Sequence, residues 1–148
     1  MTRRTHATQD APAREPRVSV LVAGEETGGA FALVGAVETK GAWLPCHLHN
    51  REEEALYVLE GSLKVWVAGG WVDAPSGSAV FLPRGVEHAH VVATEAARVF
   101  VLFVPAGFEG FYRELGAADA SSLGLERLVA TAARYGCEIT GPTAGAVG

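Results

Sequence analysis

Short runs rich in β-branched and aromatic residues follow one another from Val18 to Val104, separated by glycine, proline and charged clusters. Such runs with turn signals at regular spacing are typical of the strands of an antiparallel sandwich or barrel. No helical period interrupts them, so the sequence predicts an all-β domain. The expected strands are 18–22, 31–37, 46–49, 54–59, 63–68, 71–74, 79–82, 88–92 and 98–104.

The periodicity changes after Pro105. Apolar residues then recur at intervals of three and four over 108–115 and 125–132, which is the spacing of a helix with one buried face. We therefore predict two short C-terminal helices that pack on the barrel or on a second copy of the chain. The aromatic residues of the first helix are interpreted as packing residues rather than as a ligand site: Phe108, Phe111 and Tyr112.

These patterns divide the 148-residue chain into three parts. Residues 1–16 are polar and contain two prolines, so they are predicted to form a disordered N-terminal arm. Residues 17–105 form the predicted barrel, and residues 106–148 form the predicted helical extension. A chain of this length suits one domain and leaves little for a second.

Charge and cysteine content limit the possible partners and location. The formal net charge is −5, and the body of the chain has no basic run, so neither nucleic acid nor a membrane is an expected partner. Cys46 and Cys137 form no CxxC pair, which fits a reducing cytoplasm better than a disulfide framework. The sequence contains no secretory signal and no apolar stretch long enough to cross a membrane. We therefore expect a cytoplasmic protein.

Three histidines and a glutamate have the spacing of a metal site. His47 and His49 are two residues apart, so on a strand both side chains point to one face. Glu54 opens the next strand, where a hairpin return brings it back beside them, and His88 follows a Pro-Gly turn signal. Imidazoles with a carboxylate suit Fe, Mn, Co, Ni, Cu or Zn rather than Ca or Mg. The sequence predicts one divalent transition ion per chain, bound by His47, His49, Glu54 and His88.

Neighbouring residues offer alternatives to this assignment. Glu52 and Glu53 compete with Glu54, but a Glu-rich turn is usually solvated surface. Glu54 is preferred because it shares the parity of Leu56 and Val58, an inward-facing pair.

Other polar residues near the motif have less certain roles. Cys46 is adjacent to His47 and should point to the opposite face as a small packed hydrophobic residue. His90 shares the face of His88 and is either a proton carrier near the metal or a packed polar residue. Candidates for the pocket wall, each equally explained as core, are Trp43, Leu56, Val58, Phe81 and Phe103.

The two segments resemble the two motifs of the cupin superfamily. The pattern G-x5-H-x-H-x4-E-x6-G is matched by Gly41, His47, His49, Glu54 and Gly61. The pattern G-x5-P-x-G-x2-H-x3-N is matched by Gly77, Pro83, Gly85 and His88, with Val92 in place of the asparagine. The resemblance implies an antiparallel double-stranded β-helix, or jelly-roll barrel, with the ion held inside by the three histidines and Glu54. It also implies a homodimer.

The segments HLHNREEEALYVLEG and PAGFEGFYRELG are similar to small bacterial cupins of the quercetin 2,3-dioxygenase-like kind. This likeness implies a dioxygenase that acts on a flavonol or another small aromatic enediol, with Glu54 as both ligand and general base. Two alternatives stay open. One is a metal-dependent isomerase or cyclase, similar to polyketide cyclases, that uses no O₂. The other is a non-catalytic cupin that binds a small molecule.

Overall fold

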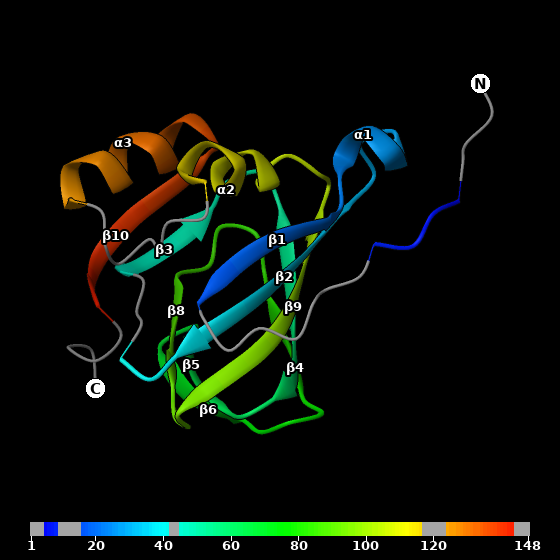
Figure 1. Ribbon diagram of the computed structural model, residues 1–148. Coiled ribbons are helices and arrows are strands. Elements are labelled where there is room, and N and C mark those ends of the chain that lie inside the picture. The colour runs from blue at the N-terminus through cyan, green and yellow to red at the C-terminus, as the bar shows by residue number, and fades with distance from the viewer. Residues whose placement is uncertain (1–4, 9–15, 42–44, 117–123, 144–148) are drawn as a thin grey trace.

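Two antiparallel sheets of five strands each form the body of the molecule (Figure 1). The computed structural model describes residues 5–8, 16–41, 45–116 and 124–143. The strand order is β1-β2-β9-β4-β7 in one sheet and β10-β3-β8-β5-β6 in the other. The strands are β1 (Arg17–Val22), β2 (Ala32–Thr39), β3 (Pro45–His49), β4 (Glu53–Glu60), β5 (Leu63–Val67), β6 (Gly70–Ala74), β7 (Ala79–Leu82), β8 (His88–Val92), β9 (Ala96–Val104) and β10 (Cys137–Thr143).

Alternating burial along the strands produces the core. In β9 the residues Ala97, Val99, Val101 and Phe103 are buried, and the residues between them are more exposed. Strands β2 and β4 flank β9 on either side, so their inward-facing side chains extend the same apolar layer. The predicted all-β class is confirmed, and the two facing sheets have the arrangement of a double-stranded β-helix. Every strand expected from the sequence is present, with small shifts at the ends.

The turn between β4 and β5 explains one of the motif glycines. Gly61 has a φ of +74°, and a Cβ at this position would lie 2.2 Å from the carbonyl oxygen of Ala96. The turn is fixed beside the start of β9 because the Ser62 amide donates a hydrogen bond to Thr94 Oγ1 at 3.1 Å. Glycine alone combines a left-handed backbone with such a close approach. Gly61 is therefore a structural requirement of the barrel rather than a site residue.

Two helices lie across one end of the barrel, as the sequence predicted (Figure 1). Helix α2 (Glu109–Leu115) buries Phe111 and Leu115, and helix α3 (Leu125–Arg134) buries Leu128 and Ala132, all within the main core. The buried residues of both helices therefore pack on the barrel of the same chain, whereas Leu125 and Val129 of α3 are exposed. A third helix, α1 (Gly24–Thr27), is a single turn between β1 and β2. The homodimer stays a prediction.

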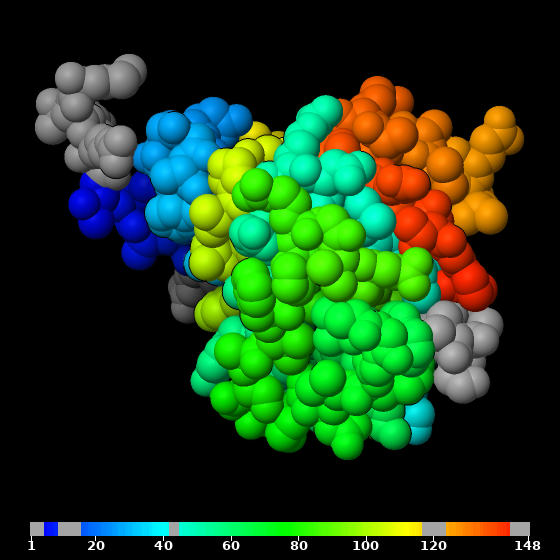
Figure 2. Space-filling model, turned by 180° about the vertical axis from the view of Figure 1, so that it is seen from behind, coloured from blue at the N-terminus to red at the C-terminus, as the bar shows by residue number. Residues whose placement is uncertain are grey.

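The C-terminal extension is not purely helical, which corrects the expectation for residues 106–148. Strand β10 follows α3 and pairs antiparallel with β3 at the edge of its sheet. Gly141 and Pro142 lie inside this strand, and both residues usually argue against a strand. They are tolerated here because an edge strand pairs on one side only. Figure 2 shows α3 and β10, in orange and red, along one border of the molecule.

The predicted N-terminal arm is described only in part. Residues 5–8 are exposed, and the His6 ring contacts the carboxylate of Glu26 near α1. The predicted disorder of residues 1–4 and 9–15 lies outside the described residues, and the three domain boundaries stay predictions. In the part of the chain that the structure describes, no helix is long and apolar enough to cross a membrane.

Candidate metal centre

The predicted ligands come from three strands and meet in the interior. His47 and His49 lie on β3, and both side chains are buried. His88 on β8 is the register partner of His47, so their side chains point to the same face of that sheet. Glu54 comes from β4 in the other sheet and is also buried. The fold therefore brings all four predicted ligands into one buried cluster.

One carboxylate oxygen lies between two imidazoles. Glu54 Oε2 is 3.1 Å from His49 Nε2 and 3.2 Å from His88 Nε2. Despite these short distances, Glu54 Oε2 and His88 Nε2 have no partner with hydrogen-bond geometry within the described residues. Buried polar atoms without partners are costly in a folded protein. Glu54 Oε2 and His88 Nε2 therefore direct lone pairs at one another with no hydrogen between them, an arrangement that a bound cation would satisfy.

Backbone carbonyls fix the orientation of two of the rings. His47 Nδ1 lies 2.8 Å from the carbonyl oxygen of Pro45, and His88 Nδ1 lies 3.2 Å from that of Val86. A carbonyl oxygen only accepts hydrogen bonds, so each Nδ1 must carry the proton. In the neutral ring the Nε2 lone pair is then free to bind a metal, which is the usual arrangement of metal-binding histidines.

The electrostatics of the cluster favour a neutral His47 and an ionised Glu54. Burial, followed by the neighbouring imidazoles of His88 and His49, lowers the pKa of His47 to about 3. Burial alone would raise the pKa of Glu54, but the imidazoles of His49 and His88 outweigh it and hold this pKa below its usual value. At neutral pH the cluster therefore contains a neutral His47 and an ionised Glu54, the forms that bind metals.

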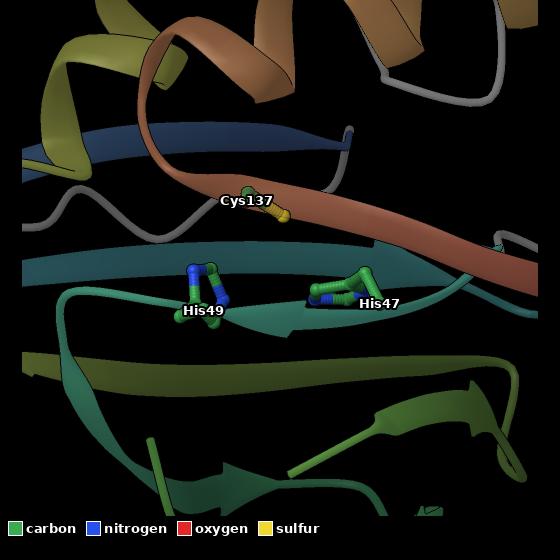
Figure 3. Close-up of side chains that lie close together, drawn as sticks. All are labelled: His47, His49 and Cys137. Carbon is green, nitrogen blue, oxygen red and sulfur yellow. The ribbon is translucent and has the colours of Figure 1, made fainter. Parts of the chain in front are cut away.

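His47 belongs to a second close group. Ligand atoms of His49, Glu54 and His88 lie within 4.8 Å of one another, and so do ligand atoms of His47, His49 and Cys137. Figure 3 shows the second group, with Cys137 reaching from β10 toward the two imidazoles of β3. Burial, then the charges of Glu54 and Glu52, raises the pKa of the Cys137 thiol to about 12. Sequence reasoning missed Cys137 because it did not predict the strand that carries it.

Of the two neighbouring glutamates, Glu53 lies as expected and Glu52 does not. Glu53 faces outward and accepts a hydrogen bond from the Arg84 amide at 2.6 Å, as the preference for Glu54 implied. Glu52 is buried at 2% exposure, which corrects its interpretation as solvated surface. Its Oε2 has no hydrogen-bond partner among the described residues and lies 3.9 Å from His49 Nδ1. Burial raises the pKa of Glu52.

Aromatic residues surround the His49 side of the cluster. The Phe108 ring packs edge-on against His49 with 4.4 Å between centroids, and Phe103 lies 5.7 Å away. Phe108 also stacks on Phe111, so the aromatic residues beside α2 are packing residues, as predicted. Burial, then Glu54 and Glu38, raises the pKa of Tyr112 well above its usual value, so its hydroxyl keeps its proton.

The predicted wall residues are placed unevenly. Leu56, Val58 and Phe103 belong to the main core. Phe81 is wrong as a wall residue because it is 60% exposed. It is the register partner of Ala55, whereas Leu82 is the partner of Glu54 and points inward. Trp43 lies outside the described residues.

Cys46 and His90 are also located. Cys46 packs with Ala89 and Trp66 in a separate apolar cluster on the other side of β3, so its predicted role as a packed residue is confirmed. His90 Nε2 lies 2.8 Å and 3.1 Å from the two carboxylate oxygens of Glu38. Burial acts to lower the pKa of His90, but Glu38 outweighs it and the pKa is raised.

The barrel and its cluster have the features of a cupin-type domain with a buried His/Glu cluster that could hold a metal ion. Residues 36–105 match the cupin domain family, so the chain carries a cupin domain and the resemblance inferred from the sequence is confirmed. The two facing sheets are accordingly those of the cupin double-stranded β-helix.

Among curated proteins the chain is distantly similar to quercetin 2,3-dioxygenases. It is 28% identical over 97 residues to the enzyme of Bacillus subtilis, which covers 66% of this chain and 29% of the relative. It is 28% identical over 102 residues to the enzyme of Aspergillus japonicus, with 64% and 29% covered. The chain thus spans only 29% of the length of these relatives.

Solved structures show the same fold. An RmlC-like cupin family protein from Methanocaldococcus jannaschii superposes with a TM-score of 0.61 at 17% identity, covering 79% of this chain and all of that chain. The polyketide cyclase RemF from Streptomyces resistomycificus superposes with a TM-score of 0.55 at 25% identity, covering 70% and 80%.

Proposed function

We propose that the protein is a metal-dependent dioxygenase that acts on a flavonol-like or other aromatic enediol. The observation that carries the proposal is the buried convergence of His49, Glu54 and His88 in a chain 28% identical to two quercetin 2,3-dioxygenases. A bound transition ion supplies Lewis-acid activation of substrate oxygens and electron exchange with O₂.

The histidines hold the ion, and their own contacts prepare them for it. Because each Nδ1–H donates a hydrogen bond to a backbone carbonyl oxygen, the Nε2 atoms of His47 and His88 point in a fixed direction. His49 is held in place by the Phe108 ring, which packs against it. Together with Glu54 these histidines would hold the ion, which would supply Lewis-acid chemistry to a substrate oxygen.

Glu54 is assigned two roles in this proposal. Its carboxylate is a ligand, and it also accepts the proton of the substrate hydroxyl as general base. Phe103 and Phe108 exclude water from the His49 side, which strengthens the charge interactions of the carboxylate.

Oxygen uptake tests the proposal directly. Metal-loaded protein is mixed with a flavonol or a catechol while O₂ is followed with an electrode and the substrate by absorbance. We expect O₂ to disappear in step with the substrate and turnover to stop under nitrogen. Equal turnover under nitrogen would refute the dioxygenase.

Equal turnover under nitrogen would favour a metal-dependent cyclase or isomerase. This candidate is supported by the likeness to the polyketide cyclase RemF, which covers 70% of the chain at 25% identity. It needs the same cluster and the same Glu54, but only the Lewis-acid part of the chemistry. The homodimer and the cytoplasmic location stay predictions under either candidate.

A further inference from the structure

Cys137 lies beside the candidate metal centre but is not in the ligand set expected from the sequence. Its Sγ and ligand atoms of His47 and His49 lie within 4.8 Å of one another, and all three side chains are buried. The close-up in Figure 3 shows Cys137 on β10, next to the strand that carries the two imidazoles. The three groups lie close enough for modest side-chain movements to bring them onto one ion.

Backbone pairing determines the direction of the thiol. Cys137 is the register partner of His49 across the β10–β3 pair, and directly paired residues project from the same face of a sheet. On the other side of β3, His88 is the register partner of His47. The face that carries the two histidines of β3 is therefore bordered by a thiol on one side and an imidazole on the other.

His49 is the ring that the two close groups share, and its two nitrogens have different neighbours. His49 Nε2 faces Glu54 at 3.1 Å, whereas His49 Nδ1 is buried and has no hydrogen-bond partner within the described residues. The ring belongs to both close groups, one with Glu54 and His88 and one with His47 and Cys137. The thiol therefore lies beside a ring that also faces Glu54, at the edge of the same cluster.

We infer that Cys137 is a further ligand of the metal centre, binding the ion through Sγ together with His47 and His49. The inference rests on the metal site of the proposed function. On binding, the S–H bond breaks, the sulfur electron pair forms the metal–sulfur bond, and the proton leaves to solvent (Cys–SH + M²⁺ → Cys–S–M⁺ + H⁺). No oxidant or reductant is required.

A thiolate ligand narrows the choice of metal. Imidazoles and one carboxylate accept any of the six transition ions predicted from the sequence, whereas sulfur favours softer ions. We therefore expect Zn²⁺, Co²⁺, Ni²⁺ or Cu²⁺ to be preferred over Mn²⁺ by a larger margin than in a site built only of nitrogen and oxygen.

Cobalt spectroscopy tests the inference on the full chain. Chelator-treated protein is titrated anaerobically with Co²⁺, and the near-ultraviolet thiolate-to-cobalt charge-transfer band is followed together with the visible bands of bound cobalt. We expect one equivalent of Co²⁺ to give the charge-transfer band in the wild type. Cys137→Ser should bind Co²⁺ without that band. Cys46→Ser is the matched control and should keep it, because Cys46 packs on the opposite side of β3.

Each outcome decides the question. If wild type and Cys137→Ser bind Co²⁺ with the same near-ultraviolet spectrum, Cys137 is not a ligand, while the metal site of the proposed function stands. If the wild type binds no Co²⁺, both the inference and the proposed function are refuted. If Cys137→Ser does not fold, X-ray absorption of the Zn²⁺-loaded wild type decides: a sulfur shell at about 2.3 Å supports the inference, and a shell of nitrogen and oxygen alone overturns it.

Discussion

Two histidines on the same face of β8 illustrate the difference between a candidate metal ligand and an ion-pair partner. His88 and His90 are two residues apart, and both are mostly buried, with side chains 3% and 15% exposed. His88 Nε2 lies 3.2 Å from a carboxylate oxygen that is also 3.1 Å from His49 Nε2. His90 Nε2 instead lies within hydrogen-bond distance of both oxygens of Glu38.

The number of imidazoles per carboxylate accounts for the contrast. Glu38 serves one imidazole, so a single proton on His90 satisfies the pair, and the pKa of His90 is raised. Glu54 is shared between His49 and His88, with His47 close by. Burial, followed by repulsion from the imidazoles of His88 and His49, lowers the pKa of His47 to about 3. A metal ion balances the shared carboxylate without that repulsion.

The largest expected effect comes from removing His88, and its strand neighbour His90 provides the comparison. His88→Ala should reduce the metal content of purified protein from about one ion per chain to near zero, because it removes an imidazole from the cluster around Glu54. His90→Ala should leave the metal content unchanged. Elemental analysis of protein purified without chelator measures both variants. Equal metal content in the two variants would break the distinction between the two histidines.

The next largest effect is expected from Glu54, and Glu38 provides the comparison. Glu54→Gln should lower turnover by about 10²–10⁴-fold, because an amide cannot accept the substrate proton. The amide oxygen can still touch the ion, so the metal content should fall less than the turnover. Glu38→Gln should leave turnover within about threefold of the wild type, because Glu38 is paired with His90 rather than with the cluster.

Steady-state kinetics with metal analysis of the same samples separates binding from chemistry. Full activity in Glu54→Gln would show that Glu54 is neither an essential base nor an essential ligand. A large loss in Glu38→Gln would show that the His90 pair takes part in the reaction.

A smaller effect is expected from Glu52, which is buried behind His49. Its carboxylate lies 3.9 Å from His49 Nδ1, and neither atom has a hydrogen-bond partner in the described chain. A carboxylate behind a metal-binding histidine orients the ring and increases its basicity. Glu52→Gln should therefore weaken metal affinity by about tenfold, measured by competition with a chromophoric chelator. Glu53→Gln is the matched control, and equal affinity in both variants would contradict a role for Glu52.

Much of the cluster could be predicted because strand periodicity determines which side chains face inward. Glu54 was correctly preferred over Glu53 because it shares the face of Leu56 and Val58, and all three are buried. The same reasoning placed Cys46 on the far side of β3. The prediction was wrong for Phe81, where parity was assigned without knowing the register of β7 against β4.

The remaining features depend on contacts distant in sequence. Cys137 reaches the cluster only because β10 pairs with β3, and the glycine and proline in that strand concealed it. Glu52 resembled a solvated residue of a charged turn, but it is buried, and a Cβ at Gly107 would lie 3.4 Å from its Oε1. Cys137 does not follow from local pattern, whereas Glu52 shares the parity of Glu54 and was misjudged because it lies in a charged turn.

The smallest predicted effect tests the ion pair of His90 through its pH dependence. The pKa of His90 is raised above 6.5 in the folded protein, so folding favours the protonated ring. The stabilisation is fully present below about pH 6.5 and is lost as pH rises through the folded pKa. His90→Gln keeps a hydrogen-bond donor but never carries a charge. Its loss of unfolding free energy should be on the order of 1 kcal/mol at about pH 6 and should shrink by about pH 9.

Urea unfolding of the wild type and His90→Gln at the two pH values measures this difference. The same comparison in a Glu38→Gln background is the control, because without the carboxylate the charge on His90 has no partner. There the effect of His90→Gln should be small and similar at both pH values. A loss of equal size at both pH values in the Glu38-containing protein would show that His90 stabilises the barrel by packing alone. The two histidines of β8 would then differ only in that His88 lies beside the carboxylate of Glu54, which His49 shares.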